Sequence, residues 1–243
     1  MLCLATAWAD PAAAPQAAQC QAGASAQVGL VVFGGWRAQG DWVLRWAQAL
    51  REQLPGSAAQ AGLCAVPGPA DAAYVREDID VGGLADAVLA APASAAPVWV
   101  VAHSSGSFVA QHWLHEVALR PAALAYLARV RYFNLDGDAG SGAHALDAGL
   151  LRQLGAATAV YVRGGGGDVS ANAGAMQALA QGSGGRVRLL ALDGSASGCL
   201  PGARWCLHDV VVTRRPHDPA GFDLQRDYGS LDEAHPVQAD YLR

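Results

Sequence analysis

The sequence predicts an α/β protein in which a mostly parallel sheet of about six strands lies between two layers of helices. Three observations support this class. Apolar, β-branched runs alternate along the chain with segments of helical spacing, and this βαβ order is typical of a parallel sheet with right-handed crossovers. The runs end at glycine, proline or polar residues. The length of 243 residues is sufficient for one domain with a buried sheet.

The first predicted strand, residues 28–33, is a buried apolar run that ends at Gly34-Gly35. Asp41 is a favourable N-cap for a helix that Pro55-Gly56 terminates. Further apolar runs predict strands at residues 63–66, 98–102, 130–135, 157–162 and 187–192. Helical spacing predicts helices at 83–91, 105–120, 144–154 and 172–181. Residues 10–26, 67–80 and 209–243 carry no strong periodicity, and we expect the last of these to wrap the surface.

The most specific motif is Ala102-His103-Ser104-Ser105-Gly106, which separates an apolar strand from an amphipathic helix. Small residues on both sides of the serine permit a strained strand-to-helix turn that exposes its hydroxyl. The helix N-terminus beneath the hydroxyl favours negative charge developing there. The motif therefore predicts that Ser104 is a nucleophile, and the alternative is a serine that caps an ordinary helix.

This motif, the Gly34-Gly35 turn and the order of elements resemble the α/β-hydrolase family. The resemblance covers residues 28–208 in element order and implies a three-layer fold around the sheet. The segments after the strands are too short for a cap domain. The two antiparallel strands that usually open this family's fold are missing from the predicted elements.

The resemblance implies a catalytic triad in the chain order serine, acid, histidine. The base is then expected after the last strand, where His208, His217 and His235 lie, and His208 is preferred because it comes first. We treat the earlier histidines, including His112 and His144, as packing or surface residues.

The acid of the triad has three candidates. Asp136 follows a predicted strand directly and precedes Gly137, which permits a tight turn over the sheet edge. Asp168 lies beyond a run of glycines, and Asp138 is a third choice. Asp136 is preferred. Each of them has a simpler interpretation as a turn-forming aspartate.

Two backbone N–H groups are expected to form an oxyanion hole. One is that of Ser105, directly after the nucleophile, and the other is that of Gly35 or Trp36, after the first strand. The alternative is a plain turn at the end of the strand.

The five cysteines indicate whether the protein resides in a reducing or an oxidising compartment. Ala7-Trp8-Ala9 fits a signal-peptidase site, so residues 1–9 are interpreted as a remnant of a signal peptide. Cys3 would leave with it. The even number that remains favours two disulfides, Cys199 with Cys206 and Cys20 with Cys64, in a secreted or periplasmic protein. Residues 10–26 are then an irregular segment and 27–243 a single domain.

Composition limits the partners. The net charge is −5 and no basic cluster is present, so a nucleic-acid partner is not expected. No apolar run is long enough to be a transmembrane segment. The cysteine and histidine spacing predicts no metal site, no cofactor is implied, and nothing specifies an oligomeric state.

The sequence as a whole favours a serine hydrolase that cleaves small-molecule or polymeric carboxylic esters through an acyl-enzyme. Acyl transfer or thioester cleavage on the same triad is the alternative. A non-catalytic binding protein that keeps the fold is a third interpretation.

Overall fold

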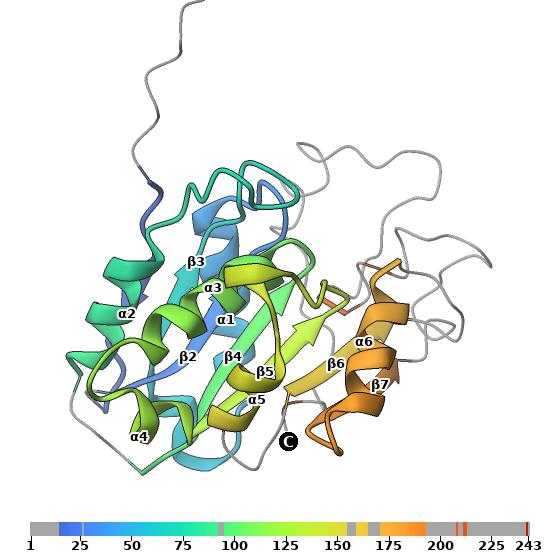
Figure 1. Cartoon of the computed structure of the whole chain (residues 1–243). Coiled ribbons are helices and arrows are strands. Elements are labelled where there is room, and N and C mark those ends of the chain that lie inside the picture. Colours follow the sequence, from blue (N-terminus) through green and yellow to red (C-terminus); the bar gives the residue numbers. More distant parts are fainter. Residues whose placement is uncertain are drawn as a thin grey trace, which may run out of the picture.

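The computed structural model describes residues 15–25, 27–91, 95–154, 159–164, 171–192, 208, 211–212 and 242. Within these residues a single sheet has the strand order β1-β3-β2-β4-β5-β6-β7 (Figure 1). All neighbouring strands are parallel except β1 and β3. The predicted α/β class and mostly parallel sheet are therefore confirmed. The strands are β1 Gln19–Gln21, β2 Val28–Phe33, β3 Gly62–Val66, β4 Val98–His103, β5 Val130–Leu135, β6 Ala159–Gly164 and β7 Val187–Leu192.

The helices that connect these strands cover both faces of the sheet (Figure 1). They are α1 Gly40–Arg51, α2 Val81–Leu89, α3 Gly106–Ala118, α4 Ala123–Leu127, α5 Ala148–Gln153 and α6 Ala171–Gly182, with short 3₁₀ helices η1 Gly56–Gln60 and η2 Gly142–His144. Asp41 lies in the first turn of α1 rather than at its N-cap. The helix expected at 144–154 is divided into η2 and α5, because Asp147 accepts a hydrogen bond from Leu150 N–H and caps a new helix.

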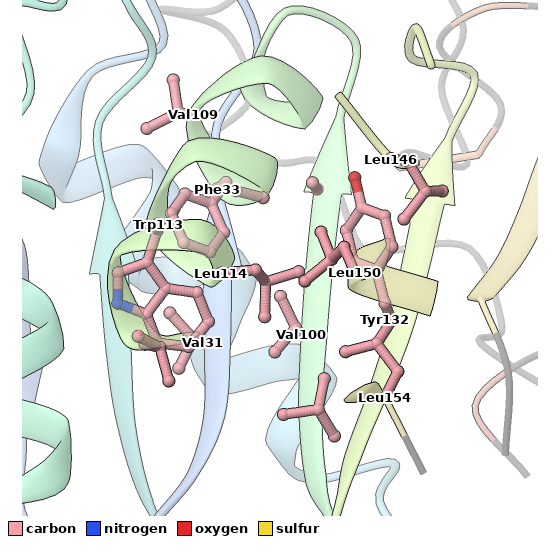
Figure 2. Packing of buried hydrophobic residues seen from close by; sticks show 14 of the residues in the cluster. Val31, Phe33, Val100, Val109, Trp113, Leu114, Tyr132, Leu146, Leu150 and Leu154 are labelled. Carbon is pink, nitrogen blue, oxygen red and sulfur yellow. The ribbon is translucent and has the colours of Figure 1, made fainter. Parts of the chain in front are cut away.

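The alternation of side chains along each strand supplies two separate cores. On one face, Val31, Val100 and Tyr132 pack against Trp113 and Leu114 of α3 (Figure 2). The other face carries side chains from intervening positions, which pack mainly against α1. The strands contribute Leu30, Val32, Trp99 and Val101 to this core, and α1 contributes Trp42, Val43 and Trp46. The strands are buried on both faces, as their continuous apolar runs predict.

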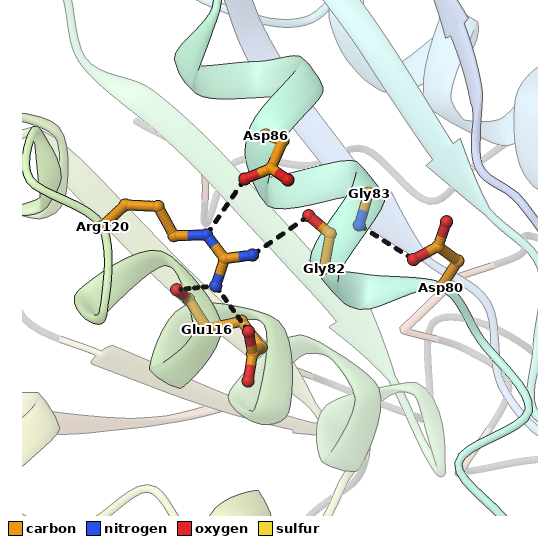
Figure 3. A network of polar contacts seen from close by, with 6 residues as sticks. All are labelled: Asp80, Gly82, Gly83, Asp86, Glu116 and Arg120. Carbon is orange, nitrogen blue, oxygen red and sulfur yellow. Dashed lines mark hydrogen bonds and ion pairs between the residues drawn. The ribbon is translucent and has the colours of Figure 1, made fainter.

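Arg120, just after α3, holds α2 and α3 together (Figure 3). Its guanidinium contacts Asp86 at 3.1 Å and the carbonyl oxygen of Gly82 at 3.4 Å on α2, and it pairs with Glu116 on its own helix. Asp80 caps the start of α2 by accepting the N–H of Gly83. This network joins α2 to the C-terminal end of α3, the helix that follows the proposed nucleophile.

The segment 10–26 is not wholly irregular, since residues 19–21 form the edge strand β1, antiparallel to β3. The sequence Gln19-Cys20-Gln21 carries no β-branched or aromatic residue, so its composition gives no strand signal. Cys20 lies opposite Cys64 and forms a disulfide with it, which confirms that predicted pairing. The disulfide fastens this strand to the sheet, although its residues have little intrinsic preference for β structure.

The C-terminal region contributes to the core on the α1 face. Val211, Val212 and Leu242 are buried there, and the Trp99 indole N–H donates to the carbonyl oxygen of Leu242 at 3.1 Å. The prediction that residues 209–243 wrap the surface is thus wrong for these three positions. Their apolar side chains belong to the same cluster as the α1 face of the sheet.

Several predictions fall on residues outside the described part of the chain. These are the signal-peptide remnant at 1–9 and the second disulfide, Cys199 with Cys206. None of the described helices is long and apolar enough to cross a lipid bilayer.

Removal of the Cys20–Cys64 bridge is expected to lower stability without changing the fold. The bridge joins residues 44 positions apart, and closing a loop of that size stabilises the folded state by about 4 kcal/mol in the chain-entropy model. Cys20→Ser should reduce the free energy of unfolding measured in urea by that order. Dithiothreitol should destabilise the wild type more than the variant, since only the wild type holds this bridge; equal sensitivity of the two would contradict the assignment.

Candidate active site

Ser104 occupies a strained turn between β4 and α3. Its φ is 52°, in the left-handed region that residues with a side chain seldom adopt. Its N–H donates to the carbonyl oxygen of Leu135 on β5 at 3.0 Å, and its own carbonyl accepts from Ser107 N–H at 3.0 Å. The backbone thus reverses from strand to helix at one residue, and Ser104 stays partly exposed while its neighbours are buried.

Gly106 permits that reversal because the start of α3 lies directly on the end of β2. A Cβ at Gly106 would lie 2.4 Å from the carbonyl oxygen of Gly34 and 2.8 Å from that of Phe33. Both are backbone atoms, which cannot rotate away as a side chain can. The small residue at this position of the motif is therefore a packing requirement.

Asp136 follows β5 as Ser104 follows β4. The two strands pair in parallel, with His103 opposite Leu135, so the residues that follow them emerge at the same edge of the sheet. The backbone of Asp136 also adopts the left-handed conformation, with φ 48°. Its N–H donates to the carbonyl oxygen of Val162 on β6 at 2.7 Å. Its side chain is 6% exposed.

The imidazole of His208 meets the Asp136 carboxylate. The Nδ1–H of His208 donates to Oδ2 of Asp136 at 2.6 Å, and the Tyr161 hydroxyl of β6 donates to Oδ1 at 2.7 Å. The His208 side chain is 13% exposed. The structure therefore brings together the preferred acid and base candidates, and the bond at Nδ1 leaves Nε2 as the ring's acceptor.

His103, directly before Ser104, contacts the candidate base His208. Its Nε2–H donates to the carbonyl oxygen of His208 at 3.3 Å, and the two ring centroids are 4.6 Å apart. Burial, and then the neighbouring His208, lowers the pKa of His103 to about 3. His103 is therefore a neutral donor at ordinary pH. His208 lies against the residue that begins the Ser104 turn.

The loop that carries Asp136 is fastened to α3 by buried polar side chains. The Ser107 hydroxyl accepts from Asp138 N–H at 2.9 Å, and Gln111 Nε2 donates to the Asp138 carbonyl at 2.8 Å. Asn134 donates to the same carbonyl and accepts from Gly137 N–H. The third acid candidate, Asp138, uses its carboxylate to accept from Gly140 N–H within this turn. These contacts fix the acid loop relative to the nucleophile turn.

The proposed oxyanion-hole groups lie around the same turn. Gly34, next to Gly35, contacts Gly106, which follows Ser105. Within the described part of the chain, no acceptor binds the N–H of Ser105, Gly35 or Trp36. The Trp36 indole N–H donates to Ala70 O at 2.9 Å, which holds this loop against the segment that follows β3.

Sequence reasoning missed Tyr161 and the role of His103. Tyr161 lies in the middle of β6, where an aromatic residue signals only a strand, and His103 precedes the serine without any pattern that marks it. The alternative candidates Asp168, His217 and His235 lie outside the described residues. Comparison with protein-family models, curated proteins and solved structures gives no match to this chain.

Gly106→Ala is expected to destabilise the protein by about 1–3 kcal/mol, the usual cost of overpacking, because its methyl group would meet two backbone carbonyls. The control is Gly174→Ala in α6, where a Cβ meets nothing within 4 Å. The control should stabilise the protein slightly, by about 0.5–1 kcal/mol. Urea unfolding of both variants measures the contrast, and similar effects would argue against the close contact.

His103 should make stability fall in acid. The unfolded state binds a proton near pH 6.5, whereas the buried ring does so only near its pKa of about 3. The neutral ring therefore contributes fully to the free energy of unfolding above pH 6.5. This contribution is lost as the pH falls from 6.5 to about 3, by up to about 1.4 kcal/mol per pH unit. Unfolding free energies at pH 7 and 4.5 should differ less in His103→Gln, which keeps a donor that does not titrate. Identical differences would refute the buried neutral histidine.

Proposed function

We propose that the protein is a serine hydrolase that cleaves carboxylic esters through an acyl-enzyme, with Ser104, His208 and Asp136 as its catalytic triad. The observation that carries the proposal is the 2.6 Å bond between His208 Nδ1 and Asp136 Oδ2, beside the strained serine turn. An acid and a base 72 positions apart in sequence meet at the sheet edge where Ser104 emerges.

The hydrogen bonds assign a role to each member of the triad. Asp136 accepts the Nδ1–H of His208, which selects the tautomer whose Nε2 can accept a proton from the Ser104 hydroxyl. The serine oxygen then attacks the ester carbonyl, and His208 returns the proton to the departing alcohol. A water molecule, deprotonated by the same Nε2, releases the acid from the acyl-enzyme.

Tyr161 supports the acid in this scheme. A buried carboxylate must be satisfied by hydrogen bonds or an opposite charge, and the Tyr161 hydroxyl binds the oxygen that His208 does not use. The carboxylate therefore stays oriented in the resting state, before any charge develops on the imidazole. When His208 takes up the proton, Asp136 stabilises the imidazolium.

The negative oxygen of the tetrahedral intermediate would bind the N–H groups of Ser105 and Gly35 or Trp36. Both segments lie at the contact between Gly34 and Gly106, and no described residue accepts a hydrogen bond from these N–H groups. The N-terminus of α3 adds its positive dipole at the same place. Donors held in this way stabilise the transition state without rearrangement.

The same proposal places the chain in the α/β-hydrolase family. The sheet order, the turn at the end of β4 and the acid after β5 agree with it, and the antiparallel edge strand β1 supplies a strand type that the sequence prediction lacked. The Cys20–Cys64 disulfide supports secretion or a periplasmic location, because such bridges persist in oxidising compartments.

The decisive experiment combines covalent labelling with turnover. A fluorophosphonate should modify the wild type once, at Ser104, and p-nitrophenyl esters of increasing chain length should be hydrolysed. Ser104→Ala should abolish labelling, and both Ser104→Ala and His208→Ala should lower kcat by roughly 10³–10⁶-fold. Mass spectrometry and absorbance report the two results.

Ser141→Ala is the matched control, since Ser141 is an exposed serine outside the site. Ser141→Ala should be labelled by the fluorophosphonate and should hydrolyse the p-nitrophenyl esters as the wild type does. Absence of labelling in the folded wild type, or Ser104→Ala activity within tenfold of wild type, would refute the proposal and leave a binding protein. Faster product release with added alcohol acceptors would instead identify acyl transfer.

A further inference from the structure

A second cluster of reactive side chains lies beside α3, apart from the proposed triad. Glu77 comes from the segment between β3 and α2, His112 from α3, and His144 from the end of η2. One potential ligand atom from each residue lies within 4.8 Å of the other two. None of the three belongs to the proposed triad, so the cluster needs a separate explanation.

The donor set is one that binds zinc. Two imidazoles and one carboxylate are a recurrent set of three protein ligands, with water in the fourth position. Bonds of 2.0–2.2 Å in a tetrahedral site place ligand atoms roughly 3.3 Å apart. His144 Nε2 and Glu77 Oε1 are already 3.1 Å apart. An ion would require only small side-chain rotations to draw the third ligand in.

The cluster is built into the fold rather than assembled from free surface groups. Tyr74 is fully buried, and its ring centroid lies 5.9 Å from that of His112 and 5.1 Å from that of His144. The two imidazole centroids are 5.0 Å apart. The packing therefore holds both rings in place, while the exposed Glu77 leaves an entry from solvent.

One polar atom in the cluster is left unsatisfied. His112 Nδ1 is buried, and no hydrogen-bond partner for it exists within the described part of the structure. A buried polar atom without a partner costs free energy, of order 1–3 kcal/mol. Neighbouring His115, by contrast, uses its Nε2 to bind the carbonyl oxygen of Ala145 at 2.8 Å. The two histidines of α3 thus differ: His115 is bonded to a carbonyl oxygen, whereas one ring nitrogen of His112 has no partner among the described residues.

We propose that Glu77, His112 and His144 bind a divalent transition-metal ion, with Zn²⁺ the ion that best fits their donor atoms. The ion joins three segments that are distant in sequence: α3, the segment before α2, and the loop after β5. That loop begins at Asp136, and its first half is already held to α3 by Ser107 and Gln111. The metal fastens its second half, at η2.

The site thus has a stabilising function that does not depend on catalysis. Its ligands touch neither Ser104 nor the pair His208–Asp136, so it stands whether or not the protein is a hydrolase. Sequence spacing gives no indication of it, because the ligands come from separate segments and no two are neighbours on one helix. Only the fold brings them together.

The test uses the full chain without a polyhistidine tag, stripped of metal with a chelator and titrated with Zn²⁺ alone. Calorimetry should show one equivalent bound, and the melting temperature should rise with Zn²⁺ concentration. Glu77→Gln and His144→Ala should weaken binding by at least the roughly tenfold to hundredfold that loss of an outer-shell partner costs. Amide exchange in residues 137–147 should slow when Zn²⁺ binds to the wild type, and it should slow less in Glu77→Gln and His144→Ala at the same Zn²⁺ concentration.

His115→Ala is the matched control, a histidine on the same helix that binds a carbonyl oxygen instead, and it should bind Zn²⁺ as the wild type does. Glu77→Gln replaces an exposed carboxylate with a side chain of the same shape, so its folding is retained. Absence of Zn²⁺ binding by the wild type would overturn the proposal. Equal affinity in Glu77→Gln and the wild type, or equal loss in His115→Ala, would do the same.

Discussion

The parallel pairing of β4 with β5 brings the candidate nucleophile and the candidate acid to the same edge of the sheet. Because His103 lies opposite Leu135, the two chains leave the sheet side by side, and each turns at once through a left-handed residue, Ser104 or Asp136. A shift of one residue in this register would point every side chain of one strand to the opposite face. The N–H of Ser104 bonds to Leu135 and that of Asp136 to Val162, so the ladder continues past the strand ends and holds both turns.

The two strained turns are maintained by the packing around them. Left-handed conformations cost of order 1 kcal/mol or more for residues with a side chain. Around Ser104 the compensating contacts are those of Gly106 with the end of β2. Around Asp136 they are polar, through Asn134, Ser107 and Gln111, all fully buried. A buried polar network requires each of its bonds, so substitution of any of these three side chains leaves a buried partner unsatisfied and is expected to loosen the acid turn.

The sequence predicted those features whose signals are local. Continuous apolar runs identified the central strands, and the small residues around Ser104 identified its turn, because both depend on neighbours in the chain. The preference for Asp136 and His208 needed the expected order of triad residues as well. Strand β1 was missed because a disulfide rather than propensity holds it. Tyr161, His103 and the Glu77 cluster were missed because their roles arise from contacts between distant segments, which composition does not encode.

The bond between Trp99 and the carbonyl oxygen of Leu242 joins positions 143 residues apart, and this has a consequence for the time at which the protein can fold during synthesis. The α1 face of the sheet is completed by Val211, Val212 and Leu242, and His208 reaches Asp136 from the same late part of the chain. A ribosome that has translated β1 to β7 therefore presents a sheet with one face partly uncovered. Contacts of such long sequence separation form slowly. The α1 face of the sheet is therefore completed only after the chain up to Leu242 has left the ribosome.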